Sequence, residues 1–117
     1  EGGSGGALAL GVGDHIAILE YGTYSVASPE ACASIVWRES EKAPEAAEAM
    51  KVGANDLKKI GIVDEIITEP IGGAHQDYDM VSANIKSSLL TNIVELSKFS
   101  QEELLQRRYQ RLLKIGA

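Results

Sequence analysis

Residues 2–6 read Gly-Gly-Ser-Gly-Gly and are followed by Ala-Leu-Ala-Leu at residues 7–10. Glycine allows a sharp backbone turn and the close approach of other atoms, whereas alanine and leucine favour helix. We therefore predict a tight loop that feeds a short helix, which ends near Gly11 or Gly13. Free backbone N–H groups and the helix dipole at such a start can hold an anion, or stabilise negative charge that develops during a reaction.

Four chemical interpretations of this loop compete with a purely structural glycine turn. A nucleotide phosphate loop needs Lys and then Ser or Thr where Ala7 and Leu8 stand, and Leu8 also replaces the third glycine of the dinucleotide fingerprint. The loop matches the G-x-S-x-G pattern of serine hydrolases, with Ser4 as nucleophile and Asp64 and His75 following in the required order, although a run of glycines meets that pattern easily. The fourth interpretation is an oxyanion hole of backbone N–H groups.

Other reactive side chains give weaker signals. His75 and Asp77 resemble two metal ligands, but no third candidate stands at a suitable spacing, so we predict no metal site. We expect His75 to form a hydrogen bond within a loop, and His15 to be structural. The one cysteine, Cys32, excludes an internal disulfide and an all-cysteine zinc site in this chain, and its alanine neighbours predict a small buried residue.

The composition is that of one soluble globular domain: 117 residues, 44% apolar and 24% charged. No apolar run approaches the ~20 residues that cross a bilayer. The net charge of −6 argues against general nucleic-acid binding. Residues 1–97 carry 6 basic and 15 acidic side chains, whereas residues 98–117 carry 5 basic and 2 acidic ones. This predicts a cationic helix on an anionic body, and a solvated helix face is the simplest interpretation of its charge. Because the first residue is Glu1, we expect the sequence to begin inside a longer chain or after processing.

The elements that must position these residues form a mixed α/β pattern. Apolar, β-branched runs predict a buried strand at residues 16–19 and further strands at 24–26 and 62–67. Ser28, Pro29 and Glu30 form a good helix start, so we predict a helix to about Arg38. Shorter helices are expected from Pro44 to about residue 52 and over residues 54–60, and glycines make a loop of residues 70–73.

Two helices are expected to complete the chain. The first covers residues 77–97, and its apolar positions recur at spacings of three and four as one stripe: Tyr78, Val81, Ile85, Leu89, Ile93 and Leu96. The second begins with a capping box, Ser100 with Glu103, and runs to Gly116.

Blocks along nearly the whole chain resemble the carboxyltransferase α subunits of multi-subunit, bacterial and plastid-type acetyl-CoA carboxylase. In order, these blocks are EGGSGGALALGVGD at residues 1–14, YSV at 24–26, SPE at 28–30, APEAAEA at 43–49, EPIGGAH at 69–75 and RRY at 107–109. Together they are specific, and the chain is most similar to the C-terminal part of such a subunit. Gln76 and Tyr78 stand where the family pattern usually has a basic residue and a proline, so no anion contact is carried over to them.

The resemblance implies a crotonase-like (ClpP/crotonase) α/β fold, in which ββα units form a spiral with a C-terminal helical extension. Residues 1–76 would be the later part of the crotonase-like domain, and residues 77–117 the helical extension. Residues 57–67, LKKIGIVDEII, resemble the helix-then-strand segment of crotonase-type proteins.

The resemblance also implies the reaction. The carboxyl group of carboxybiotin, carried on the biotin carboxyl carrier protein, would pass to acetyl-CoA and give malonyl-CoA, the first committed step of fatty acid synthesis. The implied partners are a zinc-finger β subunit in an α2β2 heterotetramer, the carrier protein and biotin carboxylase, with no cofactor bound covalently to this chain. The implied compartment is the cytoplasm or, alternatively, the plastid stroma.

By the same resemblance, the backbone N–H groups of Gly5 and Gly6 face the biotin ureido group, because a Cβ atom would fill the space that its ring must enter. No side-chain base and no metal are implied. Four further residues would border the biotin pocket: Ser4, Tyr24, Ser25 and Pro29.

Three alternatives stay open. Another crotonase-type acyl-CoA enzyme would need a side-chain acid or base, with Glu30 the first candidate. A serine hydrolase would use Ser4. A non-catalytic chain would contribute only an assembly surface. For the leading interpretation, we expect this chain alone to be inactive and poorly folded, because the stripe of the 77–97 helix needs a partner surface.

Overall fold

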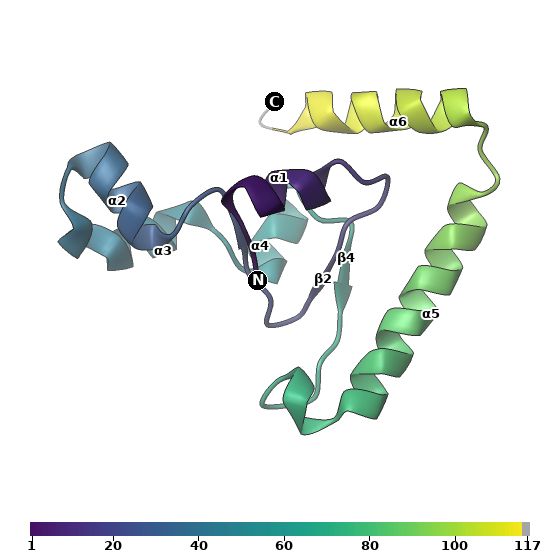
Figure 1. Cartoon of the computed structure of the whole chain (residues 1–117), viewed down its shortest axis with the longest axis horizontal. Coiled ribbons are helices and arrows are strands. Elements are labelled where there is room, and N and C mark those ends of the chain that lie inside the picture. The colour runs from purple at the N-terminus through teal and green to yellow at the C-terminus, as the bar shows by residue number, and fades with distance from the viewer. Residues whose placement is uncertain (116–117) are drawn as a thin grey trace.

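The computed structural model describes residues 1–115, a mixed α/β chain that is mostly helical (Figure 1). In chain order its elements are β1 (Gly2–Gly3), α1 (Ser4–Gly11), β2 (Ala17–Leu19), β3 (Tyr24–Ser25), α2 (Pro29–Trp37), the 3-10 helix η1 (Ser40–Lys42), α3 (Ala43–Met50), α4 (Ala54–Lys59), β4 (Glu65–Ile67), the 3-10 helix η2 (Ala74–Gln76), α5 (Tyr78–Leu96) and α6 (Gln101–Lys114). The predicted helices and strands are therefore confirmed, with strands shorter than expected. The predicted end of the last helix at Gly116 lies outside the described residues.

The strands form two small parallel sheets. β1 lies beside β3, with Gly2 opposite Tyr24 and Gly3 opposite Ser25. β2 lies beside β4, with Ala17 opposite Glu65. The mixed α/β class is thus confirmed, while a spiral of repeated ββα units remains a prediction.

Local capping explains where several helices begin and end. The Ser28 hydroxyl accepts a hydrogen bond from the backbone N–H of Ala31 at 3.2 Å, which starts α2, and Arg38 ends that helix with a left-handed φ of 61°. The Ser100 hydroxyl accepts from the Glu103 N–H at 3.2 Å, and the Glu103 carboxylate accepts from the Ser100 N–H at 2.7 Å. Both predicted helix starts are confirmed, because each uses groups within three residues.

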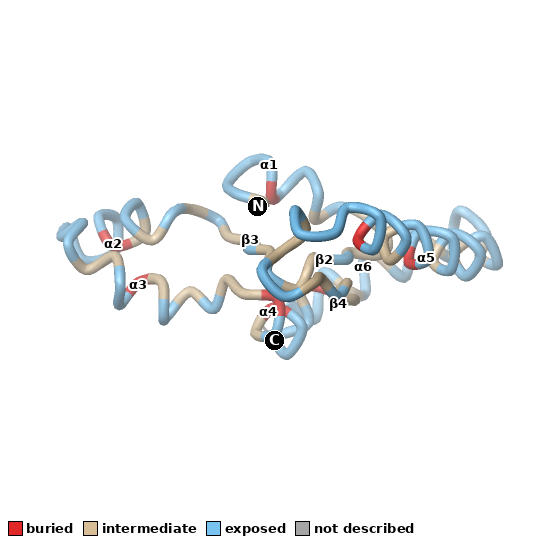
Figure 2. Tube along the Cα trace, turned by 90° about the horizontal axis from the view of Figure 1, so that it is seen from below, coloured by how far each residue is buried: buried red, intermediate tan, exposed pale blue. Residues whose placement is uncertain are grey.

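The chain is open rather than compact. Its radius of gyration is 16.2 Å, compared with about 13 Å for a compact domain of about 100 residues. In Figure 1, α2 and α3 project on one side of α1, β2 and β4, α5 lies on the other, and α6 runs across the top above α1. Figure 2 shows few buried positions along the trace. Those with apolar side chains are Ala7, Ala33, Ala46, Ala54, Leu57, Val63 and Val81.

Two predictions of burial were wrong. Cys32 is half-buried, whereas its neighbour Ala33 is fully buried. Ala33 on α2 and Ala46 on α3 are the buried positions of this helix pair, and small side chains there allow the two helices to approach closely. The strand at Ala17–Leu19 is also not buried, because Ala17 is exposed and the other two residues are only half-buried.

The predicted stripe of α5 divides between a covered and an uncovered part. Val81 is buried, but Leu89 and Ile93 are 56% and 58% exposed. Polar Ser88 is instead the other buried position of this helix, because it faces the carboxylate of Glu65 on β4. Large exposed apolar side chains continue along both final helices: Leu89, Leu90, Ile93 and Val94 on α5, and Leu105, Tyr109, Leu112 and Leu113 on α6.

Within residues 1–115, every helix falls short of the length and apolar character that crossing a membrane requires.

Candidate functional site

The glycine loop forms the start of helix α1, and the start has no side-chain cap. Gly3 is the extended N-cap residue, with φ −131° and ψ 152°, and no side chain accepts from the first turn. The N–H groups of a first helical turn have no acceptor inside the helix, and the helix dipole adds partial positive charge there. The backbone N–H groups of Gly5 and Gly6 belong to this first turn, and both residues are exposed.

Neither Gly5 nor Gly6 is required by the packing of the chain. Both are exposed, and a Cβ atom added to either would have no heavy atom within 4 Å. Glycine inside a helix costs about 0.5–1 kcal/mol relative to alanine. Two consecutive glycines in this turn thus reduce helix stability without any internal contact that needs them. The two glycines would be explained if a group that is not part of this chain had to occupy the space next to this turn.

Ser4, the first residue of α1, has a φ of +50°. A left-handed conformation in a residue other than glycine stores about 1–3 kcal/mol of strain and is found preferentially at ligand and active sites. The strain therefore occurs at the same turn that carries the two free glycines.

Tyr24 lies against α1 from the neighbouring strand. Its hydroxyl donates a hydrogen bond to the backbone oxygen of Ala7. A Cβ atom added to Gly2 would meet ring atom Cδ2 at 2.8 Å, and one added to Gly11 would meet the hydroxyl oxygen at 2.7 Å. Unlike Gly5 and Gly6, these two glycines make room for a side chain of the chain itself.

The remaining predicted pocket residues lie on the elements that follow. Ser25 is opposite Gly3 in the β1–β3 pair, and its hydroxyl donates to the Ala27 oxygen at 2.9 Å. Pro29 is the first residue of α2. The structure thus brings Tyr24 and Ser25 to the start of α1 through strand pairing, while Pro29 follows on the adjoining helix.

The serine-hydrolase arrangement is not assembled among residues 1–115. The Asp64 carboxylate accepts from the Ile16 N–H at 2.8 Å and from Arg111 at 3.2 Å. The ring nitrogen Nε2 of His75 lies 3.0 Å from the side-chain amide of its neighbour Gln76. No hydrogen bond connects Ser4, Asp64 and His75 in the described part of the chain. The predicted local hydrogen bond of His75 is confirmed.

A polar cluster that the sequence did not predict joins the second sheet to α5. One carboxylate oxygen of Glu65, Oε2, accepts from the Ser88 hydroxyl at 2.8 Å and from the Asn92 amide at 2.9 Å, and lies 2.9 Å from Nε2 of His15. Burial raises the pKa of Glu65, but the hydrogen bonds from Ser88, His15 and Asn92 together hold it below its ordinary value. The predicted structural role of His15 is confirmed. The sequence contained one indication of this cluster: Ser88 and Asn92 are four residues apart and so lie on the same face of a helix.

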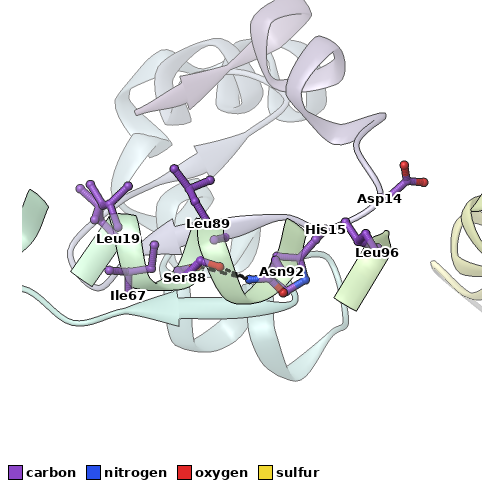
Figure 3. Close-up of a pocket in the computed structure, with 10 residues that line it drawn as sticks. Asp14, His15, Leu19, Ile67, Ser88, Leu89, Asn92 and Leu96 are labelled. Carbon is purple, nitrogen blue, oxygen red and sulfur yellow. Dashed lines mark hydrogen bonds between the residues drawn. The ribbon is translucent and has the colours of Figure 1, made fainter. Parts of the chain in front are cut away.

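Beside this cluster, a groove of about 470 Å³ runs between α5 and the strands β2 and β4 (Figure 3). Figure 3 shows Ser88 and Asn92 within it, with Leu19, Ile67 and Leu89 among the apolar residues that line it. The Ser88 hydroxyl in this groove donates to the Glu65 carboxylate, and the lining carboxylate, Asp14, is bound by Arg108.

The cationic helix α6 lies on the acidic body, as the charge pattern predicted: two of its arginines form ion pairs there, while most of its residues are exposed. Arg108 binds Asp14, and Arg111 lies 3.2 Å from Asp64 and 3.2 Å from the backbone oxygen of Gly11. The acceptors are 47 to 100 residues away in the chain, a separation that a local charge pattern does not reveal.

Residues 1–115 contain no group of three or more His, Cys, Asp or Glu side chains that could hold a metal ion. Fold and site together define a mixed α/β chain whose chemically distinctive feature is a strained, uncapped helix start. This start offers backbone N–H donors, and the hydroxyl of Ser4 beside them has no hydrogen-bonded link to Asp64 or His75 among residues 1–115.

The chain belongs to the acetyl co-enzyme A carboxylase carboxyltransferase-like family, whose model matches residues 1–116. The Vibrio vulnificus protein named acetyl-coenzyme A carboxylase carboxyl transferase subunit alpha is 59% identical over 116 residues. Proteins of the same name from Aliivibrio fischeri and Photobacterium profundum are 59% and 58% identical over 116 residues. Each alignment covers 99% of this chain and 36% of the relative, so the chain spans about a third of the relatives' length. The resemblance drawn from the sequence blocks is confirmed.

Proposed function

We propose that this chain acts in a carboxyltransferase α subunit of a multi-subunit acetyl-CoA carboxylase, which moves a carboxyl group from carboxybiotin to acetyl-CoA and yields malonyl-CoA. The family and the names of the relatives support this activity. The observation that carries the role of this chain is the helix start at Gly5 and Gly6, which is uncapped and has open space at both Cα atoms.

Carboxybiotin would supply the transferable carboxyl group, and its ureido oxygen gains negative charge when that group leaves. The N–H groups of Gly5 and Gly6 would donate to this oxygen. Backbone donors suit the task because they are neutral, rigid and already oriented, so no reorganisation is needed as charge develops. The absence of any Cβ atom at both positions leaves room for the planar ring system, which is the fit that the open space supports.

Ser4, Tyr24, Ser25 and Pro29 are proposed to border this biotin pocket. The strain at Ser4 and the strand pairing that brings Tyr24 and Ser25 to the helix start support the first three. Pro29 rests on the family resemblance and on its place at the start of α2.

The finer architecture is proposed in the same way. Residues 1–76 would form the later part of a crotonase-like domain, a spiral of ββα units, and residues 77–117 its helical extension. The parallel pairing of β1 with β3 and of β2 with β4, with helices between the strands, supports this arrangement.

The proposed partners are a β subunit, in an α2β2 heterotetramer, together with the biotin carboxyl carrier protein and biotin carboxylase. Because the acyl-CoA pocket would belong to the β subunit, we expect no carboxylation of acetyl-CoA by this chain alone. The bacterial relatives favour the cytoplasm over the plastid stroma as the compartment.

The test is carboxyl transfer by the assembled α–β enzyme carrying Gly5→Val or Gly6→Val. Valine keeps the backbone N–H, but its side chain would hold the ureido ring away from that donor, and losing one oxyanion contact typically costs a factor of about 10²–10³ in rate. Gly53→Val is the matched control, because a Cβ atom there also has no neighbour within 4 Å but lies at the start of α4. The proposal would be contradicted if the Gly5→Val variant and the Gly6→Val variant both assembled correctly and both formed malonyl-CoA at a near-normal rate.

A further inference from the structure

We propose that Tyr24 is a positioning residue, which fixes the start of helix α1 through its hydrogen bond to Ala7. Gly2 and Gly11 have no side chain and so leave room for the ring and hydroxyl of Tyr24. This inference rests on the proposed function, because the groups that it positions are the N–H donors of Gly5 and Gly6. In this role the Tyr24 hydroxyl must donate a hydrogen bond to Ala7, whereas a residue that only lines a pocket would not need that bond.

Helix α1 is too short and too rich in glycine to hold a fixed position without contacts to the rest of the chain. It has eight residues, and three of them are glycine: Gly5, Gly6 and Gly11. A helix this short is marginal in isolation, and each glycine weakens it further. The position of its first turn must therefore come from contacts with the rest of the chain.

Tyr24 makes those contacts along the length of the helix. β3 pairs with β1, which places Tyr24 opposite Gly2 just before the helix. The phenol then donates to the oxygen of Ala7, the residue directly after Gly6 and one of the few buried positions, at 4% exposure. At the far end, the hydroxyl lies where a side chain on Gly11 would be.

The bond to Ala7 bears directly on the proposed donors. A carbonyl oxygen has two acceptor sites, so the phenol can bind Ala7 without displacing a hydrogen bond of the helix. Because Ala7 follows Gly6, a shift of the Ala7 peptide moves the first turn with it. A displacement of about 1 Å in a catalytic group can cost a factor of about 10² in rate.

The first test is Tyr24→Phe in the assembled carboxyltransferase. We expect kcat per assembled enzyme to fall by about tenfold or more, with KM for acetyl-CoA unchanged, because the acyl-CoA pocket would lie on the partner subunit. A purely structural role predicts full kcat per assembled enzyme at temperatures well below the unfolding midpoint. Tyr21→Phe is the control, since Tyr21 is 56% exposed and its hydroxyl forms no hydrogen bond among residues 1–115.

The second test uses the geometry of the two glycines. Gly11→Ala places its Cβ 2.7 Å from the phenol oxygen but 4.0 Å from ring atom Cζ, which is an ordinary contact. The substitution should therefore reduce kcat when Tyr24 is present and have no further effect in the Tyr24→Phe enzyme. Gly2→Ala meets Cδ2 at 2.8 Å, an atom that phenylalanine retains, so it should reduce kcat in both backgrounds.

Wild-type kcat in Tyr24→Phe would overturn the inference, and so would a Gly11→Ala effect of equal size in both backgrounds. The outcome for Gly5→Val separates this inference from the proposed function. If Gly5→Val abolishes carboxyl transfer while Tyr24→Phe does not, only the positioning role fails. If Gly5→Val and Gly6→Val are both active, the proposed site itself fails.

Discussion

Arg108 on α6 binds both carboxylate oxygens of Asp14, with Nε–Oδ1 at 2.8 Å and Nη2–Oδ2 at 2.7 Å, across 94 positions of the chain. A two-point ion pair of this kind fixes direction as well as distance. Arg111, one turn further along, reaches Asp64 and the backbone oxygen of Gly11. The C-terminal helix thus holds the segment that leaves α1, the helix on which the proposed site is built.

This ion pair makes stability depend on pH in a defined direction. The hydrogen bond from Arg108 is the largest influence on Asp14 and, with the charges of Arg108, Arg111 and Arg107, it holds the pKa of that carboxyl below its ordinary value in spite of burial. The stabilisation is therefore complete above the pKa of an unfolded aspartate, about 3.9, and is lost as pH falls through the lower folded value.

The measurement is chemical unfolding, between pH 7 and pH 3, of the full subunit that contains this chain and of its Asp14→Asn variant. We expect the native protein to be more stable than the variant at pH 7, and the difference to shrink as the solution becomes more acidic. A difference that stays constant over this range would contradict the role assigned to the Asp14 carboxylate.

Glu65 is expected to hold α5 to the second sheet. Glu65→Ala removes the shared acceptor of Ser88, Asn92 and His15, and an unsatisfied buried donor costs about 1–3 kcal/mol. We therefore predict a loss of that size in the free energy of unfolding. Glu48→Ala is the control, because Glu48 is exposed and forms no ion pair in the described chain, and such surface changes stay within about 0.5 kcal/mol. Equal effects of the two substitutions would show that the cluster contributes nothing specific.

Ser4 is expected not to act as a nucleophile, because Asp64 is bound by Ile16 and Arg111 and His75 pairs with Gln76. The assembled enzyme, treated with an activity-based serine probe, should show no stable label at this residue. Labelling that disappears in Ser4→Ala would reverse this conclusion and favour a hydrolase.

The features that the sequence predicted well are local ones. The start of α2 at Ser28 and that of α6 at Ser100 depend on groups only three residues apart, and both were found as expected. The two glycines at the start of α1 were identified by family resemblance, and the structure adds that a Cβ atom at either would meet no heavy atom of residues 1–115 within 4 Å.

What the sequence could not provide are the contacts between distant elements. The Oε2 atom of Glu65 contacts His15, Ser88 and Asn92, which lie 50, 23 and 27 positions away in the chain. No short sequence pattern predicts contacts over such separations. Periodicity placed Val81 and Leu89 on one face of α5, but it did not tell which part of that face the chain would cover. Likewise, Gly2, Gly5 and Gly11 look alike in sequence, although two of them surround Tyr24 and one has open space.

If Gly5 and Gly6 serve a bound group rather than the packing of the chain, replacing either by alanine should raise stability but lower activity. For Gly5→Ala and Gly6→Ala, the unfolding free energy and the rate of malonyl-CoA formation are measured on the same assembled enzyme, with Gly53→Ala as control. Alanine should stabilise the helix by about 0.5–1 kcal/mol, because it favours helix and meets no neighbour within 4 Å. We predict this gain in stability together with a loss of carboxyl transfer of about 10²-fold or more, while Gly53→Ala stays active. Alanine variants that are more stable and fully active would contradict it.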